Sequence, residues 1–399
     1  MKYIIVLGDG MADYAMDELE GKTPLEYADT PEMDRLAKQS EIGLVHTIPE
    51  GMSPGSDTAN LSVLGYDPKK YYTGRSPLEA LSIGVDMKET DVALRCNIVT
   101  LSEDDVPYEE KTIIDHSSGE ISTEEAAELL KAVKEAFDSE MFQYYLGTAY
   151  RHLTIWDKGD VVPLTPPHDI LTRVIGEYLP QEPQLRAMMK KSYEILVNHP
   201  VNVKRKEQGL NPANSIWFWG AGTKPCVTSF LEKTGKKGTM ISAVDLLKGI
   251  AVGANMKNII VPGADGTLET NYEGKANAAA DALLNDGYDF AYIHVEAPDE
   301  MGHQGSVERK VKAIENLDQR VIKPLVEELG KHGVEYRMLI MPDHPTPIRL
   351  RTHTSEPVPY MIYDNVHKVL SGLKYTEKDA KESGNFIENG YTTIERLIG

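Results

Sequence analysis

The stretch that decides the fold is residues 289–303, DFAYIHVEAPDEMGH. Its first half, residues 289–295, is a short apolar run with the length of a buried strand, and Asp299 and His303 follow it closely. In an open α/β sheet the chemistry lies beyond the carboxyl ends of the parallel strands. The stretch therefore predicts a parallel α/β sheet with a polar site at one edge.

The same pattern of a strand followed by an acid occurs twice more. Residues 335–341 form a strand-like run that leads into Asp343 and His344, and residues 2–7, KYIIVL, lead into Gly8-Asp9-Gly10. Carboxylate and imidazole groups are ligands that suit Mn, Zn or Mg. Three strand-like runs end in an acid, two of them with a histidine close by, which predicts a metal centre.

Composition narrows the class of protein. A chain of 399 residues is long enough for two domains or for one domain with a large insertion. The net charge of −20 argues against a nucleic-acid partner, but not against a small anionic substrate, because a metal ion and a few arginines reverse the charge locally. Two cysteines, Cys96 and Cys226, favour a reduced, cytoplasmic protein without a thiolate metal site. The oligomeric state is not indicated.

Two further observations bear on location. The sequence has no run of 18 apolar residues, so no membrane span is expected. The apolar run at residues 1–7 is too short for a signal peptide. Both agree with a cytoplasmic enzyme.

The alternation of segments predicts the domain organisation. From residue 237 onward, strand-like and helix-like segments alternate, as is typical of a parallel sheet with right-handed crossovers. The middle of the chain has short strands, long connections and a helix that Ser122 opens with a capping box. We expect a metal-binding domain of residues 1–75 and 237–399, and a second domain of residues 76–236 inserted into it. The fold class is α/β with a mainly parallel sheet, plus an inserted α+β domain.

Six residues are candidate metal ligands. Asp299 and His303 are four positions apart, so a helical turn would place both side chains on one face. Asp343 and His344 are adjacent at a strand end, where their side chains diverge and suit two ions better than one. Taken alone, Asp9 before a glycine also fits a simple turn. The full set is enough for a two-metal site of the phosphoryl-transfer kind, and consists of Asp9, Asp299, His303, Asp343, His344 and His353.

Ser56 is the candidate nucleophile. It lies in GMSPGSDTAN, residues 51–60, where a helix start would offer backbone amides to a phosphate. A divalent cation can activate a serine hydroxyl without a histidine base. Ser56 as a mere helix N-cap is an equally open alternative. A second N-cap is expected at Thr30, before a helix that begins at Pro31.

Basic side chains could hold a phosphate or carboxylate group. Arg95 is the most informative, because it lies inside an apolar, strand-like run. The glycine-rich segments at 220–224 and 262–266 lack the spacing of a P-loop, so nucleotide binding is not indicated. The basic candidates are Arg75, Arg95, Arg151, Lys224 and Lys248.

Together these segments resemble the alkaline-phosphatase superfamily of metalloenzymes and, more closely, the archaeal-type 2,3-bisphosphoglycerate-independent phosphoglycerate mutases. The resemblance covers nearly the whole chain. It implies an alkaline-phosphatase-like three-layer domain and the interconversion of 3-phosphoglycerate and 2-phosphoglycerate through a phosphoserine, without bisphosphoglycerate, in glycolysis and gluconeogenesis. The matching segments are 8–10, 55–59, 64–68, 74–75, 77–80, 95–97, 150–152, 166–169, 214–217, 220, 299–303, 343–344 and 353–354.

The resemblance also implies roles for individual residues. Ser56 would accept the phosphoryl group and ligate a metal, with Mn as the usual cation and Mg, Zn or Co as alternatives. One ion would be held by Asp299, His303 and His353, and the other by Asp9, Ser56, Asp343 and His344. The residues implied in substrate binding are Arg95, Asp115, Arg151 and His152 of the inserted lid domain, and Lys248 near the transferred phosphate.

Two alternative activities stay open. Relatives often carry histidine where Asn60 stands, and this departure bears on the substrate. A related metal-dependent phosphotransferase would phosphorylate homoserine in the manner of a kinase, and a phosphohydrolase of the same superfamily would release phosphate. A non-catalytic metal-stabilised protein is disfavoured, because it would have no need of Ser56 beside a ligand set.

Overall fold

The computed structural model describes all 399 residues and divides them into two compact units. Met1–Tyr72 and Cys226–Gly399 form the first unit, and Thr73–Pro225 form the second. Helix α9 (Phe230–Thr234) thus lies in the first unit, whereas the sequence suggested an insertion that continued to residue 236.

The first unit is built on an eight-stranded sheet with the order β13-β2-β12-β11-β1-β10-β8-β9. Strand β1 (Lys2–Gly8) lies between β10 (Phe290–Val295) and β11 (Tyr336–Met341) and is parallel to both. Only β12 (Val358–Asp364) is antiparallel to its neighbours. The predicted mainly parallel sheet is confirmed. The remaining strands are β2 (Ser40–Val45), β8 (Gly238–Ile241), β9 (Lys257–Asn258) and β13 (Phe386–Ile387).

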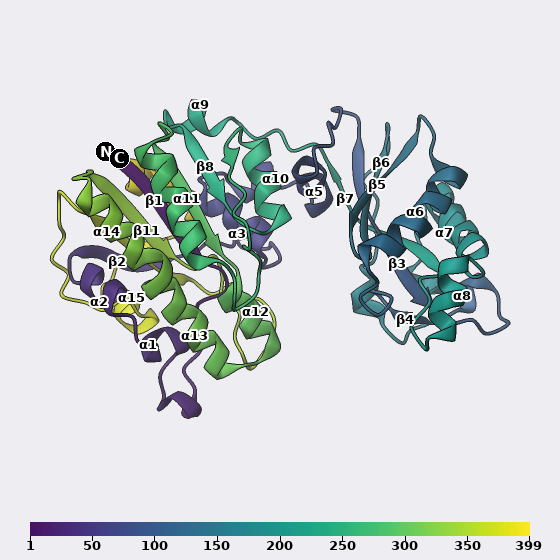
Figure 1. The fold of residues 1–399 in the computed structure, drawn as a ribbon, viewed down its shortest axis with the longest axis horizontal. Helices are drawn as coiled ribbons and strands as arrows, with labels where there is room; N and C mark the ends of the chain where they lie inside the picture. The colour runs from purple at the N-terminus through teal and green to yellow at the C-terminus, as the bar shows by residue number, and fades with distance from the viewer. The chain divides into compact units, whose positions relative to one another are not determined.

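Helices cover both faces of this sheet, which gives three layers. On one face, α11 (Tyr272–Leu284), α13 (Val307–Leu317) and α14 (Lys323–Lys331) share a core cluster with strand residues such as Ile293. Figure 1 shows these helices lying across the strands. On the other face lies α3 (Ser56–Val63), which is bonded to Tyr292, the neighbour of Ile293 that points the opposite way.

The other helices of the first unit are short, and none of the helices in the protein is long and apolar enough to cross a membrane. They are α1 (Pro24–Tyr27), α2 (Pro31–Ala37), α4 (Pro68–Tyr71), α10 (Asp245–Gly253), α12 (Ala297–Gln304), α15 (Glu377–Glu382) and α16 (Thr393–Ile398).

The N-terminus of α2 is capped from a distant part of the chain. Thr30 occupies the N-cap position and the helix begins at Pro31, as predicted, but the Thr30 side chain makes no capping hydrogen bond. Instead the buried carboxylate of Asp318, in a π-helical turn between α13 and α14, accepts from the backbone N–H groups of Met33 at 2.6 Å and Glu32 at 3.2 Å. A tertiary contact has taken over a role that is usually local.

The second unit is an antiparallel sheet with α6 and α7 on one face and the shorter α5 on the other. Its strand order is β4-β3-β6-β5. Strand β7 also pairs with β3, along the edge opposite to β6. Helix α6 begins where the sequence predicts, because Ser122 Oγ accepts from the N–H of Glu125 at 3.2 Å. The elements are β3 (Val92–Leu101), β4 (Ile113–Asp115), β5 (Phe142–Thr148), β6 (Arg151–Trp156), β7 (Ser215–Thr223), α5 (Arg75–Ser82), α6 (Thr123–Phe137), α7 (Pro183–Leu196) and α8 (Pro200–Glu207).

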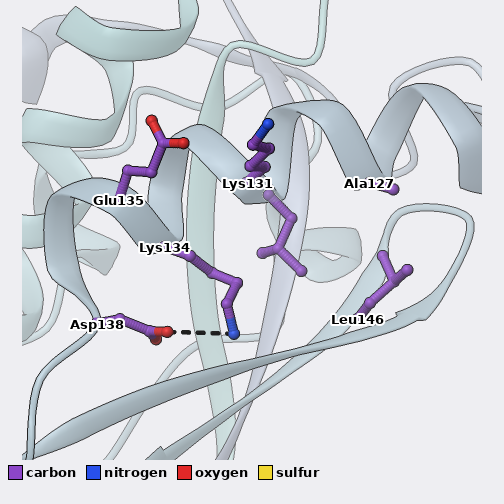
Figure 2. A pocket seen from close by; sticks show the side chains of 7 residues that line it. Ala127, Lys131, Lys134, Glu135, Asp138 and Leu146 are labelled. Carbon is purple, nitrogen blue, oxygen red and sulfur yellow. Dashed lines mark ion pairs between the residues drawn. The ribbon is translucent and has the colours of Figure 1, made fainter.

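The second unit has its own core and a surface pocket. The core combines strand residues such as Cys96 and Trp217 with residues of α6 and α7. The pocket, of about 390 Å³, lies beside α6 and is lined by side chains such as Lys131 and Leu146, with an ion pair between Lys134 and Asp138 (Figure 2). None of the residues predicted for catalysis or binding lines it.

Candidate active site

The candidate metal ligands gather at the carboxyl ends of three adjacent parallel strands. Asp9 follows β1, Asp299 lies in α12 directly after β10, and Asp343 and His344 follow β11. Because β10 and β11 lie on either side of β1, the three strand ends lie side by side. The sheet order therefore brings together residues that are more than 300 positions apart in the sequence.

One group of candidate ligands surrounds Asp299. Ligand atoms of Asp299, His344 and His353 lie within 4.8 Å of one another. His353 Nε2 is 3.4 Å from Asp299 Oδ1, and His303 Nε2 is 3.2 Å from Asp299 Oδ2 and 2.9 Å from His353 Nε2. Asp299 and His303 are one turn apart on α12, which is the arrangement that their spacing suggested.

A second group surrounds Asp9. Ligand atoms of Asp9, Asp343 and His344 lie within 4.8 Å of one another. His344 Nε2 is 3.5 Å from Asp9 Oδ1 and 3.4 Å from Asp343 Oδ2. His344 therefore belongs to both groups, and the two groups adjoin.

The charges of this site favour cations. Asp9, Asp299 and Asp343 each expose 7 % or less of their surface. Burial, together with the Asp343 and Asp299 carboxylates, raises the pKa of Asp9 well above its usual value. Three buried carboxylates with imidazoles among them and no thiolate form a donor set that fits divalent cations.

His303 and His353 stabilise the ionised form of the Asp299 carboxylate. Burial alone would raise the pKa of Asp299, but hydrogen bonds with His303 and His353 outweigh it and hold that pKa well below its usual value. The hydrogen bond between His303 and Asp299 also raises the pKa of His303 to about 9. Burial lowers the pKa of His344, so its imidazole is available as a neutral ligand.

Two glycines allow the ligand loops to approach closely. Gly10 has a φ of 59°, and a Cβ there would lie 2.5 Å from Asp299 Oδ1. A Cβ on Gly302 would lie 2.6 Å from the backbone oxygen of Thr346, whose hydroxyl donates to Asp299. Neither position has room for a side chain, so both glycines are required by the packing of the site.

Ser56 is the first residue of α3, and the N-cap position belongs to Gly55. The alternative in which Ser56 is only an N-cap is therefore wrong. Its Oγ lies 3.1 Å from His344 Nε2 and 3.3 Å from Asp9 Oδ2, beside the second group of candidate ligands. The hydroxyl is thus directed at the site, and in the first turn of α3 the Asp57 side chain accepts from the backbone N–H of Thr58 at 2.8 Å.

Asn60 links the Ser56 helix to the metal-ligand candidates. Its Nδ2 donates to the Ser56 backbone oxygen at 2.8 Å and to Asp343 Oδ2 at 2.9 Å. Its Oδ1 accepts from the Tyr292 hydroxyl at 2.5 Å. Asn60 is therefore hydrogen-bonded through both atoms of its side-chain amide and holds Asp343 in place.

Tyr292, His294 and Thr346 contact residues of the site but were not predicted from the sequence. His294 Nε2 lies 2.8 Å from Asp9 Oδ2, and burial above all lowers the pKa of His294 to about 3. The available signal was that Tyr292 and His294 are the polar members of an apolar strand at alternate positions, which places both on one face.

The basic candidates of the second unit lie on its sheet. Arg95 donates to both carboxylate oxygens of Glu79, each at 2.7 Å, and its guanidinium stacks 4.6 Å from the centre of the Trp219 ring. Arg151 is exposed, with its guanidinium 5.4 Å from the Tyr150 ring centre. His152 is buried, which lowers its pKa to about 4.

Asp115 and Lys248 have other partners in the structure. Asp115 accepts four hydrogen bonds at 2.6–2.9 Å, from the backbone and hydroxyl of Ser117, the backbone of Gly119 and the side chain of Asn211. It therefore holds the loop that follows β4. Lys248 lies on α10 of the first unit and pairs with Asp245 at 3.1 Å.

Comparisons with known proteins agree on one family. Residues 37–202 match the family model described as 2,3-bisphosphoglycerate-independent phosphoglycerate mutase. The chain is 48% identical over 404 residues to a probable enzyme of that name from Geobacter sulfurreducens, with all of both chains covered. It is 49% identical to one from Methanosarcina barkeri, covering all of this chain and 98% of the other.

Solved structures extend the likeness to three dimensions. The PH0037 protein of Pyrococcus horikoshii superimposes on this chain with a TM-score of 0.83 at 29% sequence identity. The match covers all of this chain and 96% of the PH0037 chain. The cofactor-independent phosphoglycerate mutase of Thermoplasma acidophilum matches all of this chain and 99% of its own with a TM-score of 0.67 at 26% identity. By sequence and by fold, the chain belongs to the family of 2,3-bisphosphoglycerate-independent phosphoglycerate mutases.

Proposed function

We propose that this protein interconverts 3-phosphoglycerate and 2-phosphoglycerate without a bisphosphoglycerate cofactor. Membership of the family supports the reaction. The observation that carries the proposal is the position of Ser56, whose Oγ lies within 3.3 Å of both Asp9 and His344 in a cluster of buried carboxylates and imidazoles. A serine placed in this way is suited to accept a phosphoryl group.

We propose two divalent cations, with Mn as the first choice and Mg, Zn or Co as alternatives. Asp299, His303 and His353 would hold one cation. Asp9, Ser56, Asp343 and His344 would hold the other, and His344 is close enough to both groups to contribute to either. When bound, such cations lower the pKa of the serine hydroxyl and neutralise charge on the phosphoryl oxygens.

In the proposed reaction, Ser56 Oγ attacks the substrate phosphorus and the bond between phosphorus and the glycerate oxygen breaks. The proton from Ser56 ends on the departing glycerate hydroxyl, so charge is conserved. Glycerate then reorients, and its other hydroxyl attacks the phosphoserine and restores Ser56. Asn60 keeps the start of α3 and Asp343 in fixed positions throughout.

The second unit is proposed to bind glycerate and to act as a lid. Arg95 is well suited to a carboxylate, because Glu79 and Trp219 hold its guanidinium in one orientation. Arg151 offers an exposed guanidinium, and buried His152 has an Nε2 atom without a hydrogen-bond partner. Asp115 would act through the loop that it holds. Direct contacts of these residues and of Lys248 with substrate stay predictions, as does a cytoplasmic location.

The test is an enolase-coupled assay on metal-stripped protein with 3-phosphoglycerate and no bisphosphoglycerate, before and after addition of Mn. We expect activity only after Mn is added. No activity with Mn, Mg, Co or Zn, on folded and metal-loaded protein, would contradict the proposal. Phosphorylation of homoserine from ATP, or faster release of phosphate from p-nitrophenyl phosphate than isomerisation, would identify the alternative activities.

Substitution of the nucleophile gives a second test. Ser56→Ala removes the only oxygen proposed to carry the phosphoryl group, and we expect mutase activity to fall by at least about 10³-fold. Ser53→Ala, in the same loop and exposed, is the matched control and should retain activity. Comparable activity in the Ser56→Ala variant, measured at equal protein and Mn concentrations, would rule out the phosphoserine route.

A further inference from the structure

A buried histidine behind the candidate ligands has no part in the proposed reaction. His294 lies on β10 and is fully buried. Both of its ring nitrogens have partners: Nε2 is 2.8 Å from Asp9 Oδ2, and Nδ1 is 3.2 Å from Ser242 Oγ. The backbone oxygen of His294 also accepts from Lys275 Nζ at 2.8 Å, so the residue is held at three points.

These contacts select one tautomer of His294. An Asp9 carboxylate that ligates a cation can only accept hydrogen bonds, so Nε2 must carry the ring proton. Nδ1 is then an acceptor, and the Ser242 hydroxyl must donate to it. Ser242 Oγ in turn accepts from the backbone N–H of Val244 at 3.0 Å. The chain of donors therefore runs in one direction, from Val244 through Ser242 and His294 to Asp9.

This series of hydrogen bonds distinguishes the two carboxylate oxygens of Asp9. Oδ2 accepts from His294, whereas Oδ1 lies 3.5 Å from His344 Nε2. Ser56 Oγ lies almost equally far from the two oxygens, at 3.4 Å from Oδ1 and 3.3 Å from Oδ2. Resting on the metal site of the proposed function, we propose that His294 and Ser242 are positioning residues that fix Asp9 as a one-oxygen ligand. In this role they act through Asp9 and do not touch the substrate.

Two amide variants of His294 separate this role from simple packing. His294→Gln can place its side-chain NH₂ near the position of Nε2 and keep the donation to Asp9. His294→Asn carries the same functional group on a side chain one methylene shorter, which reaches only the position of Nδ1. Loss of a partner of a metal ligand typically weakens metal affinity by about 10–100-fold. We expect such a loss of Mn affinity at one of the two sites in His294→Asn, and a much smaller change in His294→Gln.

The measurement is titration of substrate-free protein with Mn, followed by the paramagnetic resonance of free Mn, so the readout does not depend on turnover. Thermal melting establishes that each variant is folded. If His294→Asn binds two Mn ions as tightly as the unsubstituted protein, the proposal is wrong. Equal weakening in both variants would assign the loss to packing and would also overturn it. If the unsubstituted protein itself binds no Mn, the proposed metal site fails instead.

Ser242→Ala provides an independent test that leaves the histidine in place. Without the Ser242 donor, Nδ1 of His294 loses its hydrogen-bond partner, while Asp9 still requires the ring proton on Nε2. In the Mn-free diamagnetic protein loaded with Mg or Zn, ¹⁵N shifts should show His294 protonated at Nε2 with and without Ser242, and Ser242→Ala should move only the resonance of the unprotonated Nδ1. We expect kcat to fall with little change in KM. A His294 protonated at Nδ1 in the loaded, unsubstituted protein would overturn the inference.

Discussion

His303 keeps its proton above neutral pH in the cation-free protein, because its hydrogen bond with Asp299 raises its pKa to about 9. A bound cation needs the lone pair on an imidazole nitrogen, so binding below pH 9 must displace this proton. The apparent affinity for Mn should therefore rise about tenfold per pH unit for this one proton, and level off above about pH 9.

Calorimetric titration with Mn in two buffers of different ionisation enthalpy, between pH 6.5 and 8.5, measures both the affinity and the protons released. His332→Gln is a suitable control, because His332 is an exposed histidine outside the ligand set. An affinity that does not change over this range would show that His303 is not a ligand.

At the scale of elements, a single lysine of α13 joins two of the ligand loops. Lys310 is fully buried, and its Nζ donates to Asp13 Oδ2 at 2.9 Å and to the backbone oxygens of Thr346 at 2.8 Å and Ala12 at 3.3 Å. Asp13 belongs to the loop after β1, and Thr346 to the loop after β11. The lysine thus holds together the two loops that carry Asp9 and Asp343.

Lys310→Met should remove these hydrogen bonds and leave the buried Asp13 carboxylate without the lysine ammonium group that pairs with it. Loss of one partner of a buried ion pair typically costs about 3–5 kcal/mol, and we expect this decrease in the free energy of unfolding. Urea unfolding of metal-free protein measures it. Lys312→Met on the same helix removes only a surface pair at 3.5 Å, and should change stability by less than about 0.5 kcal/mol. Equal effects of the two substitutions would contradict the argument.

The fold and the candidate site could be predicted from the sequence at some elements and not at others. The ends of β1, β10 and β11 were predictable, because an apolar run that stops at an acid is a local pattern. The cap of α2 was not, because Asp318 reaches it from far along the chain. Lys310 was not either, because a lysine on an amphipathic helix usually faces water, and only the packed loops reveal its partners.

At the scale of the whole molecule, every candidate ligand and Ser56 belong to the first unit, and the second unit is a continuous segment with its own core. Mn should therefore stabilise only the first unit, by about 2.7 kcal/mol at a free concentration of 100 times the dissociation constant. We expect calorimetry of an isolated fragment of residues 73–225 to show a cooperative melt that is the same in Mn and in EDTA. A fragment without a cooperative melt, or one stabilised by Mn, would contradict this.

The central position of β1 has a consequence for synthesis on the ribosome. Tyr3 pairs with Phe290 on one side and Arg337 on the other, so the first strand to be made has no partner until residue 290 has been translated. At roughly 5–20 residues per second, this delay lasts roughly 15–60 s. The second unit is complete well before then and can fold first. Meanwhile an apolar strand with two open edges remains exposed to neighbouring chains, which makes nascent polypeptide a natural client for a chaperone that shields hydrophobic segments.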